Sequence, residues 1–82
     1  MDTVLLNLYS TSHCHLCEEA ESLLINISNQ QQIQWECIEI ADDPNLLEQY
    51  ALKIPVIKRI DIDTDINWPF GELDIKNLLN LK

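Results

Sequence analysis

The chain has 82 residues, 46% of them hydrophobic, and we expect a single domain over 1–82 because so short a chain has little apolar surface to divide. Asp and Glu number 14 against 5 Lys and Arg, and the formal net charge of -9 would repel phosphate backbones and anionic lipids. This charge argues against nucleic acid and membrane partners. No apolar run approaches the ~18 residues that cross a bilayer. Three cysteines leave one over from any pairing, which fits a reducing compartment and predicts a soluble, cytoplasmic protein.

The first predicted element is a strand. Its apolar run from Val4 to Tyr9 is closed by the polar residues 10–12, which suits a strand that is covered on both faces and followed by a loop. The run has neither a basic start nor a small-residue cleavage site, so we interpret it as a strand and not as a signal peptide.

An amphipathic helix is predicted from Cys14 to about Ser28. The apolar side chains at helical spacing are Leu16, Ala20, Leu23, Leu24 and Ile27. A polar loop over 29–32 follows, and residues 33–40 alternate as a strand does. A strand-helix-strand unit joins parallel strands through a right-handed crossover, which puts the helix on one face of the sheet. We expect Cys37, in the second strand, to be a core residue, since free cysteines are among the most buried residue types.

The second half of the chain predicts a short helix, a hairpin and a final helix. Asp43 can cap a helix that has Pro44 at its first position. The run 56–60 indicates a third strand, with 61–65 as a connection to an antiparallel fourth strand around 66–68. Residues 72–79 predict the last amphipathic helix. The side chains expected to pack inward from these two helices are Leu46, Leu47, Tyr50, Ala51, Leu73, Ile75, Leu78 and Leu79.

The pair Cys14-x-x-Cys17, between a strand and a helix, indicates thiol redox chemistry. Two cysteines at this spacing can meet across one helical turn, and a helix N-terminus lowers a thiol pKa from about 8.5 toward ~7 or below. Cys14 at the helix start is therefore the predicted nucleophile. Cys17 shares a helical face with Ala20 and Leu24, so it should be partly buried and act as the resolving thiol. Such exchange requires no cofactor.

Charged neighbours and possible metal ligands surround the pair. A protonated His15 would favour the thiolate, whereas the carboxylates of Glu18 and Glu19 would disfavour it. The alternative function is a metal-binding or metal-delivery protein that uses the His13-Cys14-His15-Leu16-Cys17 loop. Structural zinc sites usually take two further ligands from a second segment, and Cys37 lacks a paired neighbour there. We therefore favour redox chemistry and predict no metal.

The order of elements and three motifs resemble the glutaredoxin-like branch of the thioredoxin superfamily over essentially the whole chain. The motifs are the segment from Tyr9 to Cys17, Ile54-Pro55-Val56, and Trp68-Pro69-Phe70. The resemblance implies an α/β, thioredoxin-like (glutaredoxin-type) fold in the order β-α-β-α-β-β-α. Four strands would form a mixed sheet flanked by three helices. It also implies that the protein is a dithiol thiol-disulfide oxidoreductase with a redox-active disulfide.

The same resemblance implies how substrate would be held. Pro55 would be cis and lie against the Cys14–Cys17 loop, with the backbone of Ile54 facing a bound thiol substrate. The sequence has no Pro-Tyr between its cysteines and no Gly-Gly before the last helix, which counts against a dependence on glutathione. The expected partner of this monomer is a disulfide-containing protein or a low-molecular-weight thiol.

Overall fold

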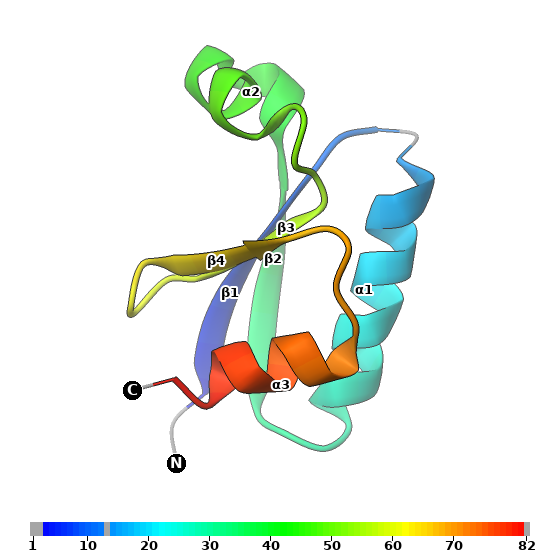
Figure 1. The fold of residues 1–82 in the computed structure, drawn as a ribbon, viewed down its shortest axis with the longest axis vertical. Coiled ribbons are helices and arrows are strands. Elements are labelled where there is room, and N and C mark those ends of the chain that lie inside the picture. The colour runs from blue at the N-terminus through cyan, green and yellow to red at the C-terminus, as the bar shows by residue number, and fades with distance from the viewer. Residues whose placement is uncertain (1–2, 13, 82) are drawn as a thin grey trace.

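The computed structural model describes residues 3–12 and 14–81, which form a four-stranded mixed sheet with three α-helices (Figure 1). The elements are β1 (Val4–Ser10), α1 (His15–Ser28), β2 (Ile33–Glu39), the 3₁₀ turn η1 (Ile40–Asp42), α2 (Pro44–Tyr50), β3 (Val56–Arg59), β4 (Thr64–Asn67) and α3 (Glu72–Leu79). Their order is the predicted β-α-β-α-β-β-α. Within the described ranges, no helix is long and apolar enough to span a bilayer.

The strands lie in the order β2-β1-β3-β4. β1 pairs in parallel with β2, where Leu8 lies opposite Cys37, and antiparallel with β3, where Leu8 lies opposite Ile57. β3 and β4 form the predicted antiparallel hairpin. β2 and β4 are therefore the edge strands, and each pairs with a neighbouring strand along one edge only.

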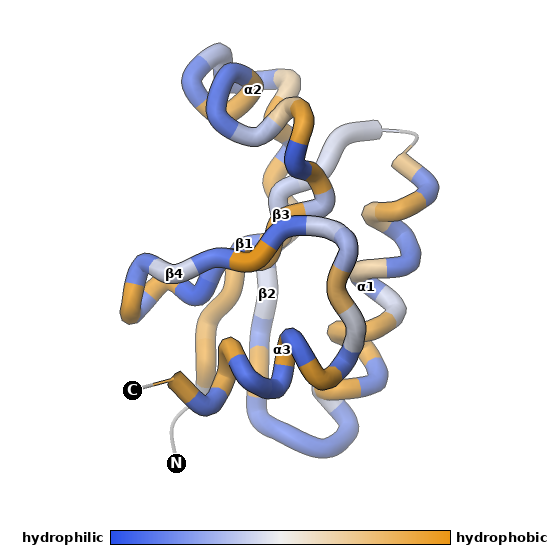
Figure 2. Tube along the Cα trace, viewed as in Figure 1, coloured by the Kyte–Doolittle hydropathy of each residue, from blue (hydrophilic) through white to orange (hydrophobic). Residues whose placement is uncertain are grey.

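The helices α1 and α3 cover one face of the sheet and bury the larger core (Figure 1). Leu6 and Leu8 of β1 point to this face with Ile57 of β3, because side chains alternate along a strand. Figure 2 shows the contrast along the chain between the largely hydrophobic β1 and the hydrophilic loop that joins α1 to β2. The buried members of this larger core are Leu6, Leu8, Ala20, Leu24, Ile27, Ile33, Ile57, Phe70, Ile75, Leu78 and Leu79.

The opposite face carries a smaller cluster that packs against α2. Its buried members are Tyr9, Ile40, Tyr50 and Val56. The rings of Tyr9 and Tyr50 stack with their centroids 4.5 Å apart and their planes at 20°. Ile54 packs against this smaller cluster, so the residue before Pro55 rests on the aromatic side of the sheet.

Local sequence signals mark the residues at which α2 and α3 begin. The Oδ1 atom of Asp43 accepts hydrogen bonds from the N–H groups of Asn45 at 2.9 Å and Leu46 at 3.4 Å, and Pro44 takes the first helical position of α2. Both predicted signals are confirmed. At the start of α3, the Gly71 N–H donates to Asp74 Oδ2 at 2.8 Å. The boundaries of α3 match the predicted helix over 72–79.

Arg59, the last residue of β3, holds the end of α3. Its Nη1 donates to the carbonyl oxygens of Leu78 at 3.1 Å, Leu79 at 2.8 Å and Leu81 at 2.8 Å. Its Nε and Nη2 donate to the two carboxylate oxygens of Asp61 at 2.8 and 3.0 Å, and these bonds hold the pKa of Asp61 below its usual value. One guanidinium therefore binds three carbonyl oxygens at and just beyond the C-terminal end of α3, where a helix leaves carbonyls without intrahelical partners.

Some of the predicted burial is wrong. Cys37 is exposed, because β2 is an edge strand and its residues lack the cover that a central strand receives. Leu5 is 51% exposed, so β1 is not covered on both faces along its whole length. The short α2 leaves Leu47 and Ala51 exposed and turns Tyr50 inward.

In α3, Leu73 is 71% exposed, whereas Ile75, Leu78 and Leu79 are buried as predicted. Ile75, Leu78 and Leu79 follow the spacing of one helical face, and Leu73 lies outside that face.

Candidate active site

The two cysteines of the Cys-x-x-Cys pair lie where β1 passes into α1. Cys14 is the N-cap of α1, in extended conformation, and its Sγ accepts a hydrogen bond from the Cys17 N–H at 3.2 Å. The two residues form a disulfide with their Cα atoms 5.2 Å apart. Cys14 is partly exposed, while Cys17 is buried at 6% exposure. The predicted burial of Cys17 is confirmed.

Glu39, at the end of β2, anchors the loop that leads into this pair. Its Oε1 accepts hydrogen bonds from both the N–H and the Oγ of Ser12, each at 2.8 Å. Its Oε2 accepts the Ala41 N–H at 3.2 Å and so caps η1. The bond from Ser12 and then that from Ala41 hold the pKa of Glu39 below its usual value. The carboxylate therefore remains charged at neutral pH and ties the loop to the sheet.

A cleft of about 190 Å³ opens beside the disulfide. Its lining residues come from β1, the loop after it, α1 and β2, and they are Leu8, Ser10, Thr11, Cys14, Cys17, Glu18, Glu21 and Cys37. All three cysteines of the chain therefore face one cleft, together with two carboxylates. Of the residues that the structure describes, no Lys, Arg or His lines it.

Glu21 links α1 to β2 across this cleft. Its Oε2 accepts hydrogen bonds from Trp35 Nε1 and from Cys37 Sγ, both at 3.2 Å. Partial burial of the Cys37 thiol, followed by its hydrogen bond to Glu21 and the charge of that carboxylate, raises the pKa of Cys37 to about 11. Sequence reasoning assigned no role to Glu21. Its position one helical turn after Cys17 is the signal that could have placed it beside the pair.

The Ile54-Pro55 segment lies before β3 and has the predicted cis peptide bond. Pro55 is buried, and its carbonyl oxygen accepts the Trp68 N–H at 3.0 Å. The Ile54 N–H donates to the Tyr50 carbonyl oxygen at 3.1 Å, which fixes the segment to the end of α2. Neither Ile54 nor Pro55 lines the cleft beside the disulfide, and their contact with substrate stays a prediction. A second cis bond, Trp68-Pro69, was not predicted.

The potential metal ligands that the structure describes do not gather into a site. His15 Nδ1 lies 3.6 Å from Glu18 Oε2, and both side chains are exposed. Over residues 3–12 and 14–81, no group of three His, Cys, Asp or Glu side chains could hold a metal ion. His13, which belongs to the alternative metal-binding loop, lies outside the described residues.

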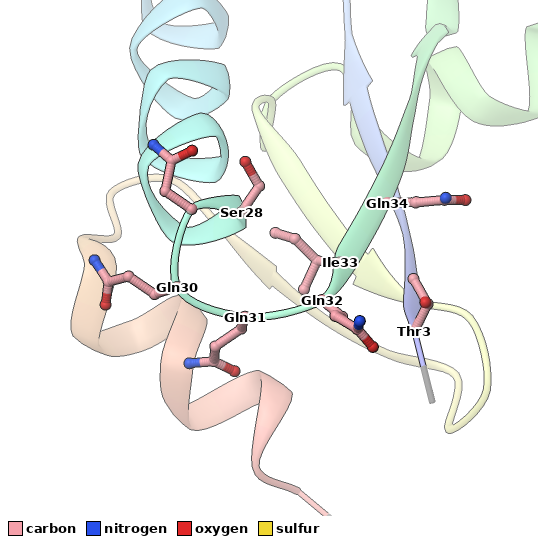
Figure 3. Close-up of a pocket in the computed structure, with 8 residues that line it drawn as sticks. Thr3, Ser28, Gln30, Gln31, Gln32, Ile33 and Gln34 are labelled. Carbon is pink, nitrogen blue, oxygen red and sulfur yellow. The ribbon is translucent and has the colours of Figure 1, made fainter. Parts of the chain in front are cut away.

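A larger depression, of about 450 Å³, lies at the other end of α1, between the α1–β2 loop and the start of β2 (Figure 3). It is lined mainly by uncharged amide side chains, including those of Gln30, Gln32 and Gln34. Figure 3 shows these side chains pointing in different directions and not toward a common centre. The depression therefore lacks the convergent polar groups of a binding site.

A parallel β1-α1-β2 unit, followed by a cis proline before an antiparallel hairpin, defines a thioredoxin-like fold, and the disulfide at the start of α1 fits a thiol redox role. The chain matches the family model described as Glutaredoxin-like domain (DUF836) over residues 5–80, and it belongs to this family.

Two solved structures share the fold. The X-ray structure of the structural genomics target XcR50 from X. campestris is 28% identical, with a TM-score of 0.80 over 92% of this chain and 95% of that one. The solution structure of Ne2328 from Nitrosomonas europaea is 23% identical, with a TM-score of 0.85 over 95% of this chain and 93% of that one. Among curated proteins, none matches the sequence.

Proposed function

We propose that this protein is a dithiol thiol-disulfide oxidoreductase in which Cys14 is the nucleophile and Cys17 the resolving thiol. The observation that carries the proposal is the position of Cys14 Sγ at the N-cap of α1, where the Cys17 N–H donates to it at 3.2 Å. Once the disulfide is reduced, this N–H and the positive end of the helix dipole favour a thiolate at Cys14. Cys17, 6% exposed, is shielded from external disulfides.

The reaction begins with the Cys14 thiolate attacking one sulfur of a substrate disulfide. A bond forms between Cys14 Sγ and that sulfur, the substrate S–S bond breaks, and the other substrate sulfur leaves as a thiolate with the electron pair. Cys17 then loses its proton and attacks Cys14 Sγ, which displaces the second substrate thiolate. The substrate is reduced to two thiols, the protein is oxidised to the Cys14–Cys17 disulfide, and the protons of the two cysteines end on the products.

Substrate would lie along the backbone of Ile54 beside Pro55, and the partner is a disulfide-containing protein or a low-molecular-weight thiol. The smaller cluster beneath α2 supports this assignment because it holds Ile54 in place. The protein acts as a monomer in the cytoplasm, without a metal or cofactor and without nucleic acid or membrane partners. The net charge of -9 supports the exclusion of phosphate and anionic lipid surfaces.

Single cysteine variants test the proposal. Cys14→Ser should abolish disulfide exchange, and Cys17→Ser should accumulate a mixed disulfide that mass spectrometry detects. Cys37→Ser is the matched control, since it removes a thiol from the same cleft and should leave two-step exchange intact. Full reductase activity in Cys14→Ser would refute the assignment of the nucleophile.

A redox titration that follows tryptophan fluorescence should show a two-electron transition between about -270 and -120 mV, the range of known exchange enzymes.

A further inference from the structure

The cleft that holds the disulfide carries negative charge. Glu18 and Glu21 both line it, and its other polar lining groups, apart from the cysteines, are the hydroxyl-bearing Ser10 and Thr11. Glu18 stands at the exposed rim, with 81% of its side chain accessible, whereas Glu21 is partly buried. A substrate sulfur that reaches Cys14 therefore brings its neighbouring groups close to two carboxylates.

The charge of Glu21 is not neutralised by its partners. The carboxylate accepts hydrogen bonds from the Trp35 indole and from the Cys37 thiol, and neither donor carries a charge. Because the pKa of Cys37 is raised to about 11, the thiol stays protonated and adds no positive or negative charge at neutral pH. These two bonds hold the Glu21 carboxylate in one place against β2.

Three strong cations lie closest in sequence to the substrate segment. Lys53 is exposed and does not line the cleft, and the other two are engaged elsewhere. Lys58 Nζ pairs with Asp63 Oδ1 at 2.6 Å, and Arg59 is bound to Asp61 and to carbonyl oxygens at the end of α3. A substrate thiol with carboxylates of its own would therefore meet negative charge in the cleft, with no described Lys or Arg among the lining residues.

We propose that Glu18 and Glu21 are specificity-determining residues that make the site prefer disulfides flanked by cationic groups over anionic ones. The natural partner would then be a protein cysteine among Lys or Arg side chains, or a cationic small thiol. The inference rests on the proposed exchange reaction and names its substrate class. Each carboxylate acts on the substrate through the electric field, which is longest-ranged at low ionic strength.

The test uses three probe disulfides that differ in charge: cystamine, which is cationic, hydroxyethyl disulfide, which is neutral, and oxidised glutathione, which is anionic. The full-length protein is reduced, freed of reductant and mixed with each disulfide, and the loss of its thiols is timed. Dividing each rate by the rate with dithiothreitol removes the intrinsic reactivity of the disulfide. We expect the normalised rate for cystamine to exceed that for oxidised glutathione about tenfold at low salt and about twofold at 1 M, where the Debye length is about 3 Å.

Substitutions that remove one charge identify the source of this preference. Glu21→Gln keeps an oxygen for Trp35 and Cys37, and it should reduce the cationic-to-anionic rate ratio about threefold, with a similar or smaller reduction for Glu18→Gln. Glu36→Gln is the control. It makes the same change in net charge at an exposed residue of β2 whose side chain leaves the opposite face from that of Cys37. A structural defect in Glu21→Gln would slow all three disulfides and leave their ratio unchanged.

Equal normalised rates for the three disulfides in the wild-type protein would overturn the inference and leave the exchange reaction standing. An unchanged ratio in both Glu21→Gln and Glu18→Gln, or an equal change in Glu36→Gln, would also overturn it. Failure of every disulfide to oxidise the protein would instead refute the proposed function and, with it, this inference.

Discussion

The two faces of the sheet are built differently. Beneath α1 and α3 lies the larger core, which is mostly aliphatic and draws its buried residues from those helices, from β1, β2 and β3 and from Phe70. Beneath α2 lies the smaller cluster, where two stacked tyrosine rings meet Ile40 and Val56. The larger core packs beneath α1, the helix on which Cys17 is buried, whereas the smaller cluster supports Ile54.

This difference implies that one face of the sheet mainly stabilises the fold and that the other mainly positions the segment expected to contact substrate. The free energy of unfolding should come mainly from the larger core, because it removes most apolar surface from water. The smaller cluster contributes less but lies directly beneath the Ile54-Pro55 segment. Substitutions on the first face should therefore lower stability and spare exchange in the folded protein. Substitutions on the second face should cost less stability and slow exchange more.

Leu24→Ala should have the largest effect. Leu24 is fully buried at the centre of the larger core, and its truncation leaves a cavity that costs about 3–4 kcal/mol of unfolding free energy. Urea denaturation measures the change. The adjacent Ile25→Ala is the control, since Ile25 is 50% exposed and its truncation should cost well under half as much. Comparable losses in the two variants would contradict the assignment of this core.

Arg59→Met should come next, with a loss of about 2–3 kcal/mol, because it removes the donor for three carbonyl oxygens at the end of α3. The side chain is 12% exposed, so water replaces these bonds poorly. Lys58→Met is the matched control on the preceding residue, whose ammonium pairs only with the exposed Asp63. A larger loss in Lys58→Met would show that the guanidinium does not secure α3.

Tyr50→Leu should lower the unfolding free energy by about 1–2 kcal/mol, since it removes the stacked ring while keeping an apolar side chain. We expect it nevertheless to slow disulfide exchange more than Leu24→Ala does, when both proteins are fully folded. Tyr50→Phe retains the stack and should leave the exchange rate close to that of the wild type. If Tyr50→Leu exchanged at the wild-type rate, the smaller cluster would have no part in positioning Ile54.

The smallest effect concerns Cys37 in the oxidised protein, where it is the chain's one thiol outside the disulfide. Its pKa of about 11 means that little thiolate is present at pH 8, so iodoacetamide should react about tenfold more slowly than with a free cysteine of pKa about 8.5. The rate should rise about tenfold per pH unit up to pH ~10, as the thiolate fraction grows. Glu21→Gln should lower the pKa and shift this profile to lower pH.

Local patterns predicted most of the fold, because the elements are short and strongly marked. Asp43 and Pro44 start α2 as expected, and the spacing of Ile75, Leu78 and Leu79 fixes the buried side of α3. These features depend on neighbours in the sequence. The burial of Cys37 could not be predicted in the same way, since alternation in a strand does not tell whether the strand lies at the edge of the sheet.

The candidate site was predicted in part for the same reason. The burial of Cys17 follows from the helical face that it shares with Ala20 and Leu24, and it is confirmed. Glu21 was missed because its importance depends on Trp35 and Cys37, which reach it only when β2 packs against α1. Contacts between distant segments of this kind have no local signal in a single sequence.

The Glu39 carboxylate holds two segments, the loop before Cys14 and the η1 turn before α2. Protonation of this one group therefore affects both segments. Ser12 in the loop and Ala41 in η1 donate hydrogen bonds to its two oxygens, and these bonds are stronger while the carboxylate is ionised. A group whose pKa is lowered on folding stabilises the fold above its unfolded pKa, and this contribution is lost as the pH falls through the folded value. Acid below the usual pKa of a glutamate side chain therefore weakens the attachment of both segments through a single protonation.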